Sequence, residues 1–310
     1  MVYEFMMQQK PRHRLATDAT LRAGAEIILE GNQAHYLTTV LRLAVGDRLA
    51  MFNRTDGEWL VRIADIAKKK LTVTVEKQTR LPARGINLII CFAPIKGGRL
   101  ETIVEKATEL GASVLQPVIT SRTIVDKVNL ERAEAIAREA AEQCERVDWP
   151  EIRPPVKLEK LLGDWPADVP LIYGDESGAS GSIARLLSGR NAPEGGEPPL
   201  TPSFAFGSGS RHKALRTPTS SEESSVAFHG EPRSEGVSEA KGDIPPSWSI
   251  LIGPEGGFTP EEFALLKRVN AAKGVGLGPR ILRADTAVIT LAALTLAAWG
   301  DWDQAPRFNP

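Results

Sequence analysis

One segment, residues 250–262 with the sequence ILIGPEGGFTPEE, constrains the fold of this chain more than any other. Its apolar start is typical of a buried strand, which ends at Gly253-Pro254. Gly256 and Gly257 let the backbone turn sharply and approach a ligand closely. The Thr-Pro-Glu-Glu that follows has the pattern of a helix N-cap, a first-turn proline and a capping-box acid. We therefore expect a strand, a bare loop and a helix, which is where open α/β sheets bind ligands.

A second loop, residues 276–287, also carries glycines between a strand-like run and an apolar helix. Either loop alone is equally well explained as an ordinary strand–helix turn. The two loops together, with Arg280 and Arg283 in the second, favour a site in which both close on one small molecule.

Strands and helices alternate from residue 85 onward, which predicts a mostly parallel sheet covered by helices on both faces. Continuous apolar runs indicate strands buried on both faces, and apolar residues at helical spacing indicate the helices. The expected strands are 86–92, 114–119, 171–174, 249–253 and 274–277, and the expected helices are 100–110, 130–147 and 287–299.

The N-terminal part of the chain has a different pattern. Short strand-like runs at 25–30, 48–53, 59–66 and 71–77 are separated by turn signals, and one helix is expected at 33–41. This spacing predicts a small β barrel. Residues 1–82 carry 13 Lys and Arg against 9 Asp and Glu, which mildly favours an RNA-facing domain, although a solvated surface explains it almost as well. The expected domains are 1–82 and 83–310.

A stretch at about 189–245 interrupts the second domain. It is rich in Ser, Gly and Pro and has no periodic apolar face. Such a segment cannot bury enough surface to offset its chain entropy. We therefore expect a disordered insertion that loops outward between two core strands.

The composition excludes several classes of protein. Cys91 and Cys144 are far apart and the four histidines do not cluster, so neither a zinc site nor a disulfide scaffold is expected. The first ten residues lack the apolar core of a signal peptide. The most apolar helix, of about 14 residues, is too short to span a bilayer of roughly 30 Å. We expect a soluble, cytoplasmic protein with no metal and no membrane partner.

Common catalytic motifs are also absent from the sequence. It contains no P-loop, no strand leading into Gly-x-Gly-x-x-Gly, no Gly-x-Ser-x-Gly elbow and no His-Glu-x-x-His. The remaining candidate is a site in which backbone groups hold a flat or zwitterionic ligand, with arginines at its edge.

Several motifs together resemble one known family. They are Gly253–Phe258, Leu277–Arg283, His35–Asp47, Lys96–Arg99 with Lys106–Gly111, Ser121–Thr123 and Glu142–Arg146. Outside the insertion, the chain is similar to the knotted, SPOUT-type RNA methyltransferases, specifically to the bacterial family that methylates N3 of a uridine in 16S ribosomal RNA. Each motif alone is weak, whereas the set is highly specific.

The resemblance implies an α/β, parallel-sheet SPOUT fold with a C-terminal trefoil knot, preceded by a small PUA-like β-barrel domain that binds RNA. It also implies a homodimer and S-adenosyl-L-methionine as the cofactor. The residues that would bind the cofactor are Tyr173, Gly174, Gly253, Pro254, Glu255, Gly256, Gly257, Leu277, Gly278, Arg280, Ile281, Leu282 and Thr286. The last apolar helix would be core plus dimer interface, although core alone explains it equally well.

The reaction assigns roles to several arginines. The uracil N3–H must lose its proton, and a cation near the ring oxygens would stabilise the anion. Arg283 is the first candidate, because its loop should border the methyl group, and Arg12 is the second. An ion pair of Arg283 with Glu255 and a solvated Arg12 are the alternatives. Contacts with ribosomal RNA in the small subunit are expected from Arg14, Arg42, Lys96, Arg99, Arg122 and Arg146.

One site residue departs from the family pattern, since Asp285 stands where the family usually has Glu. Two other functions remain open. One is a non-catalytic RNA-binding ribosome-assembly factor on the same fold, against which the intact glycine loops and both arginines argue. The other is a nucleotide-dependent α/β enzyme acting on a small molecule, for which no phosphate-cradling lysine is visible.

Overall fold

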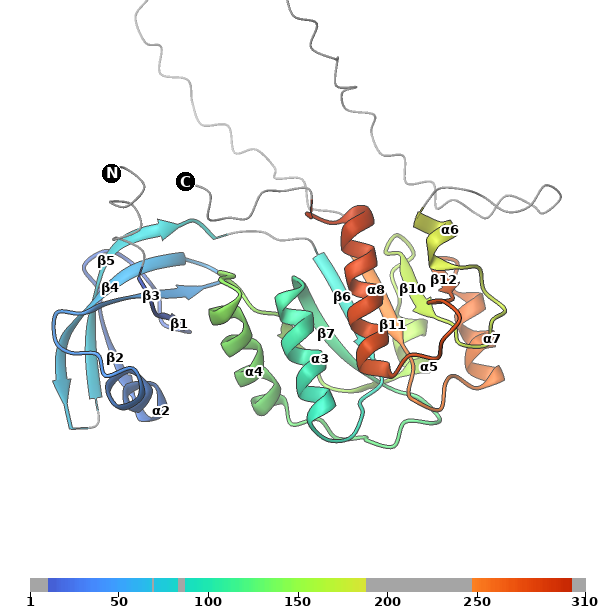
Figure 1. The fold of residues 1–310 in the computed structure, drawn as a ribbon, viewed down its shortest axis with the longest axis horizontal. Coiled ribbons are helices and arrows are strands. Elements are labelled where there is room, and N and C mark those ends of the chain that lie inside the picture. The colour runs from blue at the N-terminus through green and yellow to red at the C-terminus, as the bar shows by residue number, and fades with distance from the viewer. Residues whose placement is uncertain (1–10, 69, 83–86, 188–246, 303–310) are drawn as a thin grey trace, which may run out of the picture. The chain divides into compact units, whose positions relative to one another are not determined.

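The computed structural model of the chain describes residues 11–68, 70–82, 87–187 and 247–302 (Figure 1). Within these residues the strands form two separate sheets, one from the N-terminal part of the chain and a larger one from the rest. The disordered insertion expected at about 189–245 lies outside the described residues.

The N-terminal sheet is curled and has the strand order β1-β3-β4-β5-β2 (Figure 1). Its strands are β1 (Arg14–Ala16), β2 (Glu26–Glu30), β3 (Arg48–Asn53), β4 (Gly57–Ala67) and β5 (Lys70–Arg80). β1 runs parallel to β3, and the other neighbouring strands are antiparallel. The four predicted strands are confirmed, whereas β1 is too short to show a pattern in the sequence.

Alternate residues of these strands face one core. Val61 on β4 and Val73 on β5 are fully buried, as expected for a sheet with one apolar face. The helix predicted at 33–41 is present as a short α2 (Gly31–His35) that continues into a π-helical turn, η1 (Tyr36–Val40). Leu37 of this turn is fully buried and closes the core.

The larger sheet is parallel and has the order β12-β10-β11-β6-β7-β8, with β9 paired to β7. Its strands are β6 (Asn87–Phe92), β7 (Ala112–Ile119), β8 (Glu151–Ile152), β9 (Val156–Lys157), β10 (Leu171–Gly174), β11 (Ser247–Ile252) and β12 (Ala272–Val275). The predicted strands are confirmed, although β12 lies two residues before the expected range. β11 is inserted between β10 and β6, so segments far apart in the sequence lie side by side.

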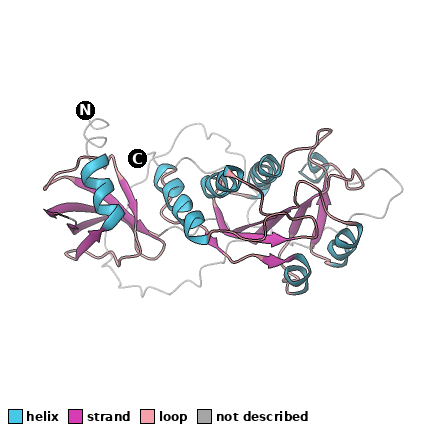
Figure 2. Ribbon diagram, turned by 90° about the horizontal axis from the view of Figure 1, so that it is seen from below, coloured by secondary structure: helices cyan, strands magenta, loops and turns pink. Residues whose placement is uncertain are grey.

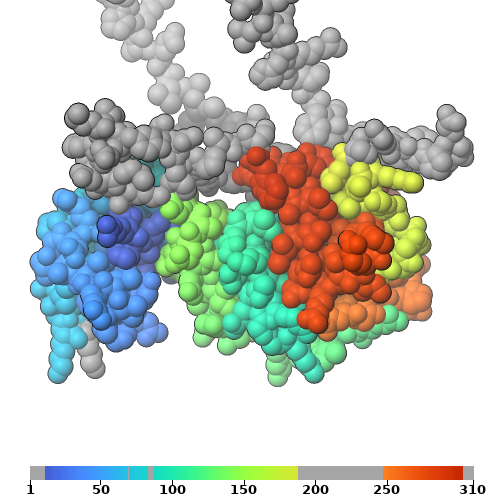
Figure 3. Space-filling view, viewed as in Figure 1, coloured from blue at the N-terminus to red at the C-terminus, as the bar shows by residue number. Residues whose placement is uncertain are grey.

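Helices cover both faces of this sheet (Figure 2). They are α3 (Gly98–Glu109), α4 (Leu130–Gln143), α5 (Leu158–Gly163), α6 (Ile183–Leu187), α7 (Pro260–Arg268) and α8 (Ala284–Trp299). α8 packs beside α3 (Figures 1 and 3) and buries Val288 and Leu291 in the core. α4 ends four residues before its predicted end, because Glu145 takes a left-handed conformation with φ 62° that no helix can continue through.

Two kinds of feature, a membrane-spanning helix and a metal-binding group, are not found among the described residues. None of the helices described in the structure has both the length and the apolar character needed to cross a bilayer. The described ranges also contain no group of three His, Cys, Asp or Glu side chains placed to hold a metal ion.

Candidate active site

The strands of the larger sheet run parallel, so the loops that follow their carboxyl ends gather at one edge. A cavity of about 210 Å³ lies among the loops after β10, β11 and β12. It is lined by Gly174, Asp175, Glu176, Gly178, Ile252, Gly253, Pro254, Glu255, Gly257, Gly276, Leu277, Gly278, Pro279, Arg280, Ile281, Leu282, Ala284 and Ala287. The two glycine-bearing loops therefore do face one shared cavity.

Close approach determines the course of the loop after β11. Gly257 has a φ of 70°, and a Cβ atom there would lie 1.9 Å from Oε1 of Glu176. The same oxygen accepts a hydrogen bond from the backbone N–H of Phe258 at 3.2 Å. A Cβ atom on Gly253 would lie 3.0 Å from the Phe258 ring. The backbone angle at Gly257 therefore favours glycine, and a side chain there would displace the Glu176 carboxylate.

The predicted capping box at the start of α7 is confirmed. Thr259 Oγ1 accepts a hydrogen bond from the Glu262 backbone N–H, and Glu262 Oε2 accepts one from the Thr259 backbone N–H at 2.8 Å. Glu262 is only 2% exposed, and its Oε1 accepts a further hydrogen bond from the Ser121 backbone N–H at 2.7 Å. One buried carboxylate thus ties the end of the loop after β11 to the loop after β7.

Two arginines bind the same loop from neighbouring segments. Arg122, in the loop after β7, donates to the carbonyl oxygen of Gly256 at 2.5 Å and to that of Phe258 at 3.5 Å. Arg99, in the first turn of α3, forms an ion pair with Glu255. The loop at 253–257 is therefore held by side chains that follow β6 and β7.

Charged groups are unevenly placed around the cavity. Asp175, Glu176 and Glu255 line it together with Arg280. Burial opposes ionisation of Asp175, but hydrogen bonds from Ser177 and Ser180 outweigh it and lower the pKa of the carboxyl group. The cavity thus offers carboxylates to a cationic group and one guanidinium to an anionic group, as a zwitterionic ligand with an additional positive charge requires.

Most residues predicted to bind the cofactor line this cavity. Tyr173, Gly256 and Thr286 do not. The Tyr173 ring contacts the rings of Phe258 and Phe263, and the Gly256 carbonyl is bound by Arg122. The binding roles of the whole predicted set stay predictions. Those that line the cavity are Gly174, Gly253, Pro254, Glu255, Gly257, Leu277, Gly278, Arg280, Ile281 and Leu282.

The sequence reasoning missed the acidic residues of the cavity. Asp175 and Glu176 directly follow Tyr173 and Gly174, which the family resemblance already assigns to the cofactor site. The signal was therefore present, because side chains just beyond the carboxyl end of a parallel strand point into such a crevice.

The two predicted catalytic arginines lie in different places. Arg283 is exposed at the N-cap of α8, next to the lining residues Leu282 and Ala284, and within the described residues it forms no ion pair. Its alternative partner Glu255 is paired with Arg99. Arg12 lines a separate cavity of about 330 Å³, together with Arg14, Tyr36, Glu142 and others. Catalytic roles for both arginines stay predictions.

The residues predicted to contact RNA fall into two groups. Arg42, Lys96 and Arg122 are exposed, and Arg99 is partly exposed. The side chains of Arg14 and Arg146 are only 7% and 13% exposed. Their guanidinium groups donate to backbone carbonyl oxygens, so these two are placed as structural contacts.

Neither thiol is suited to act as a nucleophile. Cys91 is fully buried in β6, and this burial raises the pKa of its thiol to about 12. Burial also raises the pKa of the Cys144 thiol. Because the thiolate is the reactive form of cysteine, covalent catalysis by either residue is disfavoured.

Both parts of the chain match known RNA-modifying families. Residues 82–195 and 218–296 match the model of the RNA methyltransferase domain, and residues 29–76 match that of the RNA methyltransferase PUA domain. The chain belongs to the RNA methyltransferase family.

Individual relatives narrow this class. Ribosomal RNA small subunit methyltransferase E of Rickettsia conorii is 30% identical, over 91% of this chain and 93% of the relative. The Synechocystis protein of the same name is 32% identical, over 85% of this chain and 70% of its own. A putative methyltransferase of Legionella pneumophila, solved with bound SAM, superposes with a TM-score of 0.67 at 25% identity, covering 93% of this chain and 98% of that chain. The expected α/β SPOUT-type fold with an N-terminal PUA-like domain is confirmed.

Proposed function

We propose that this protein transfers the methyl group of S-adenosyl-L-methionine to N3 of a specific uridine in 16S ribosomal RNA. The observation that carries the proposal is the cavity at the carboxyl ends of β10 and β11, which joins the loops 253–257 and 276–287 in a chain of this family. The small-subunit methyltransferase relatives and the SAM-bound Legionella protein support it.

The cavity has the features that this cofactor needs. Gly253 and Gly257 leave its wall without side chains, so backbone N–H and C=O groups are accessible to an adenine ring. Asp175 and Glu176 would face the positive sulfonium and amino groups, and Arg280 the carboxylate. When bound, the cofactor would supply an electrophilic methyl group and leave as S-adenosyl-L-homocysteine, while the N3 proton of the uridine passes to water.

The residues of the chain would then align and stabilise the substrate. The loop at 276–287 would border the methyl group and place Arg283 near the uracil ring, where its charge would favour loss of the N3 proton. Alignment of sulfur, methyl carbon and N3 is the main demand of a direct transfer. Arg12 remains the second candidate for contact with the base.

The N-terminal sheet would bind the RNA, in a domain that we place at 1–82, with the catalytic domain at 83–310. We keep Arg42, Lys96, Arg99 and Arg122 as RNA contacts, because exposed positive charge suits phosphates. We further propose, from the family resemblance, a C-terminal trefoil knot and a cytoplasmic homodimer that uses the outer face of α8.

A non-catalytic assembly factor on the same fold is the alternative. The test is to incubate the protein with methyl-labelled cofactor and unmodified small ribosomal subunits, digest the RNA and identify the labelled nucleoside. Label in 3-methyluridine is expected. Cofactor binding without label in any RNA would refute the reaction, and absence of cofactor binding would favour the assembly factor.

A further inference from the structure

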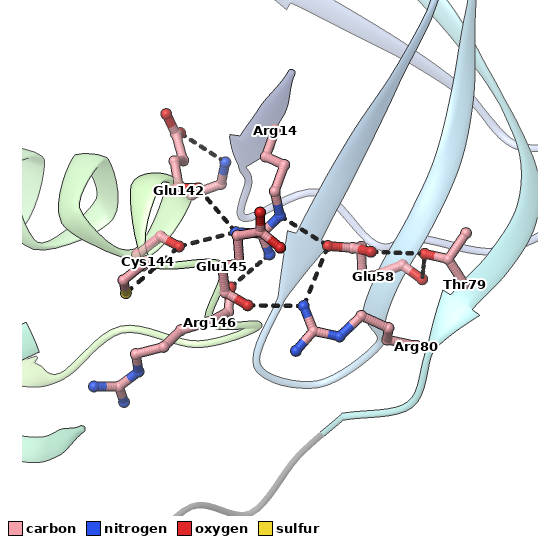
Figure 4. Close-up of polar contacts among 10 residues, drawn as sticks. Arg14, Glu58, Thr79, Arg80, Glu142, Cys144, Glu145 and Arg146 are labelled. Carbon is pink, nitrogen blue, oxygen red and sulfur yellow. Dashed lines mark hydrogen bonds and ion pairs between the residues drawn. The ribbon is translucent and has the colours of Figure 1, made fainter. Parts of the chain in front are cut away.

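The carbonyl groups at the end of α4 are bound by an arginine of the N-terminal sheet (Figure 4). Nη1 of Arg14, on β1, donates to the carbonyl oxygens of Ala141 at 2.9 Å and Glu142 at 3.0 Å. Nη2 donates to that of Arg146 at 2.6 Å. An α-helix leaves its last carbonyls without partners inside the helix. Here those partners come from the other sheet.

Two further residues complete this contact. Arg80, the last residue of β5, donates to the carbonyl oxygen of Glu145 at 2.7 Å. Glu58, on β4, accepts from Nε of Arg14 at 2.9 Å and lies 3.6 Å from Nη1 of Arg80. We call this contact the α4 joint: it comprises Arg14, Glu58 and Arg80 together with residues 141–146.

The α4 joint is buried and geometrically demanding. The side chains of Arg14 and Glu58 are 7% and 10% exposed, so each charge depends on its partner for compensation. The Arg14 guanidinium also lies 4.3 Å from the centre of the Phe52 ring. A positive charge at a helix C-terminus is favourable because it faces the negative end of the helix dipole. Only the fork of an arginine can serve three carbonyls and a carboxylate at once.

The contact is reciprocal and continues into the catalytic sheet. The backbone N–H of Ala16, on β1, donates to Oε1 of Glu142 at 2.9 Å. Arg146, just beyond α4, donates to the carbonyl oxygens of Thr108 at 2.6 Å and Ala112 at 3.0 Å. These carbonyls lie at the end of α3 and the start of β7. A continuous set of partly buried hydrogen bonds therefore links β1 to β7 of the larger sheet.

We propose that Arg14 is a positioning residue: it fixes the N-terminal sheet on the end of α4, so that RNA held by that sheet meets the cavity in one geometry. The proposal rests on the proposed function, because it assumes that the N-terminal sheet binds the RNA substrate. Arg14 acts through the orientation of that sheet, without touching RNA or cofactor.

The test uses the full-length protein and the conservative variant Arg14→Lys, which keeps the charge and loses the fork. Arg132→Lys is the matched control, because Arg132 is an exposed residue of α4 whose ion-pair partner, Glu101 on α3, lies outside the N-terminal sheet. The measurements are the Kd for S-adenosyl-L-methionine, KM and kcat with small ribosomal subunits, and the radius of gyration from small-angle X-ray scattering.

We expect Arg14→Lys to raise KM for subunits roughly tenfold, as the loss of a charge-assisted hydrogen bond allows, and to increase the radius of gyration. The Kd for the cofactor should stay within about twofold of the wild type, since no residue of the α4 joint lines the cofactor cavity. The control should change none of these three quantities. General destabilisation would lower the active fraction and thus apparent kcat, and would leave KM unchanged.

The proposal is overturned if a folded Arg14→Lys variant has the KM and the radius of gyration of the wild type. It is also overturned if this variant loses affinity for the cofactor as well as for the subunits. If that variant does not fold, Glu58→Gln takes its place with the same expected and contrary results. Failure of the proposed function is distinguishable, because the wild type would then transfer no methyl group while the scattering comparison still tests the α4 joint.

Discussion

Gly257→Ala is expected to weaken cofactor binding far more than the same change at the adjacent Gly256. Gly257 has a φ of 70°, and a left-handed backbone costs an alanine about 1–2 kcal/mol. Its Cβ would also lie 1.9 Å from Oε1 of Glu176. Glu176, whose side chain is exposed, must then move and give up its hydrogen bond to the Phe258 N–H, at a cost of about 0.5–1 kcal/mol.

The two costs together come to about 2–3 kcal/mol, which corresponds to roughly thirty- to hundredfold in an equilibrium constant. The free loop relieves this strain by relaxing, so the cost returns when the ligand requires the original loop conformation. It therefore appears mainly in the Kd for S-adenosyl-L-methionine, measured by titration calorimetry, and only weakly in the thermal midpoint of the protein.

Two neighbouring glycines separate the contributions. At Gly256 the φ is not positive, and an added Cβ meets only the flexible Arg122 side chain at 3.3 Å. Gly278 has a φ of 104° with no atom within 4 Å of the added Cβ, so it has strain without a clash. The expected order of affinity loss on substitution by alanine is Gly257, then Gly278, then Gly256. Equal Kd values for Gly257→Ala and Gly256→Ala would refute this reasoning.

Three further predictions concern Arg283, Arg122 and Glu142. Arg283→Ala should lower kcat at least tenfold, by analogy with loss of one stabilising donor, while the cofactor Kd changes little; unchanged turnover contradicts the role. Arg122→Ala should raise the Kd for the cofactor about five- to tenfold, because the Gly256 carbonyl loses its hydrogen-bond donor. Arg132→Ala is the control, because Arg132 forms a surface ion pair with Glu101. Burial raises the pKa of Glu142 to about 7, so this group contributes stability below about pH 4.5 that is lost as pH rises through 7. The free energy of unfolding of Glu142→Gln, measured relative to that of the wild type by chemical denaturation, should therefore rise between pH 5 and pH 8 by up to about 3 kcal/mol. The same difference at both pH values would contradict this prediction.

The sequence predicts the larger sheet well because its signals are local. Strands such as β6 are buried on both faces and appear as unbroken apolar runs. The capping box at Thr259 and Glu262 fixes the start of α7 within a few residues of chain. The strand order is not local information, since β11 pairs with β6 across more than half of the sequence.

The errors have physical reasons of the same kind. α5 is absent from the predicted helices. Leu158, Leu161 and Leu162 have helical spacing, but a helix of six residues is too short to show a repeated apolar face. The sequence pattern predicts that α4 continues to residue 147, but the left-handed Glu145 ends it, and the carbonyl groups of Glu145 and Arg146 bind Arg80 and Arg14. Arg14 itself could not be told from an exposed RNA contact, because burial of a charge depends on partners distant in the chain.

The loop at 253–257 is held by residues that do not line the cavity, so the side of the loop that faces the cavity is free of their side chains. Glu262 and Arg122 bind the loop and the start of α7 without lining the cavity, whereas Gly253 and Gly257 line it. A direct methyl transfer needs correct alignment more than it needs a strong acid or base. Displacing the loop by a fraction of an ångström therefore costs rate even when every ligand contact remains possible. Residues such as Glu262, remote from the methyl group, are for this reason expected to determine turnover.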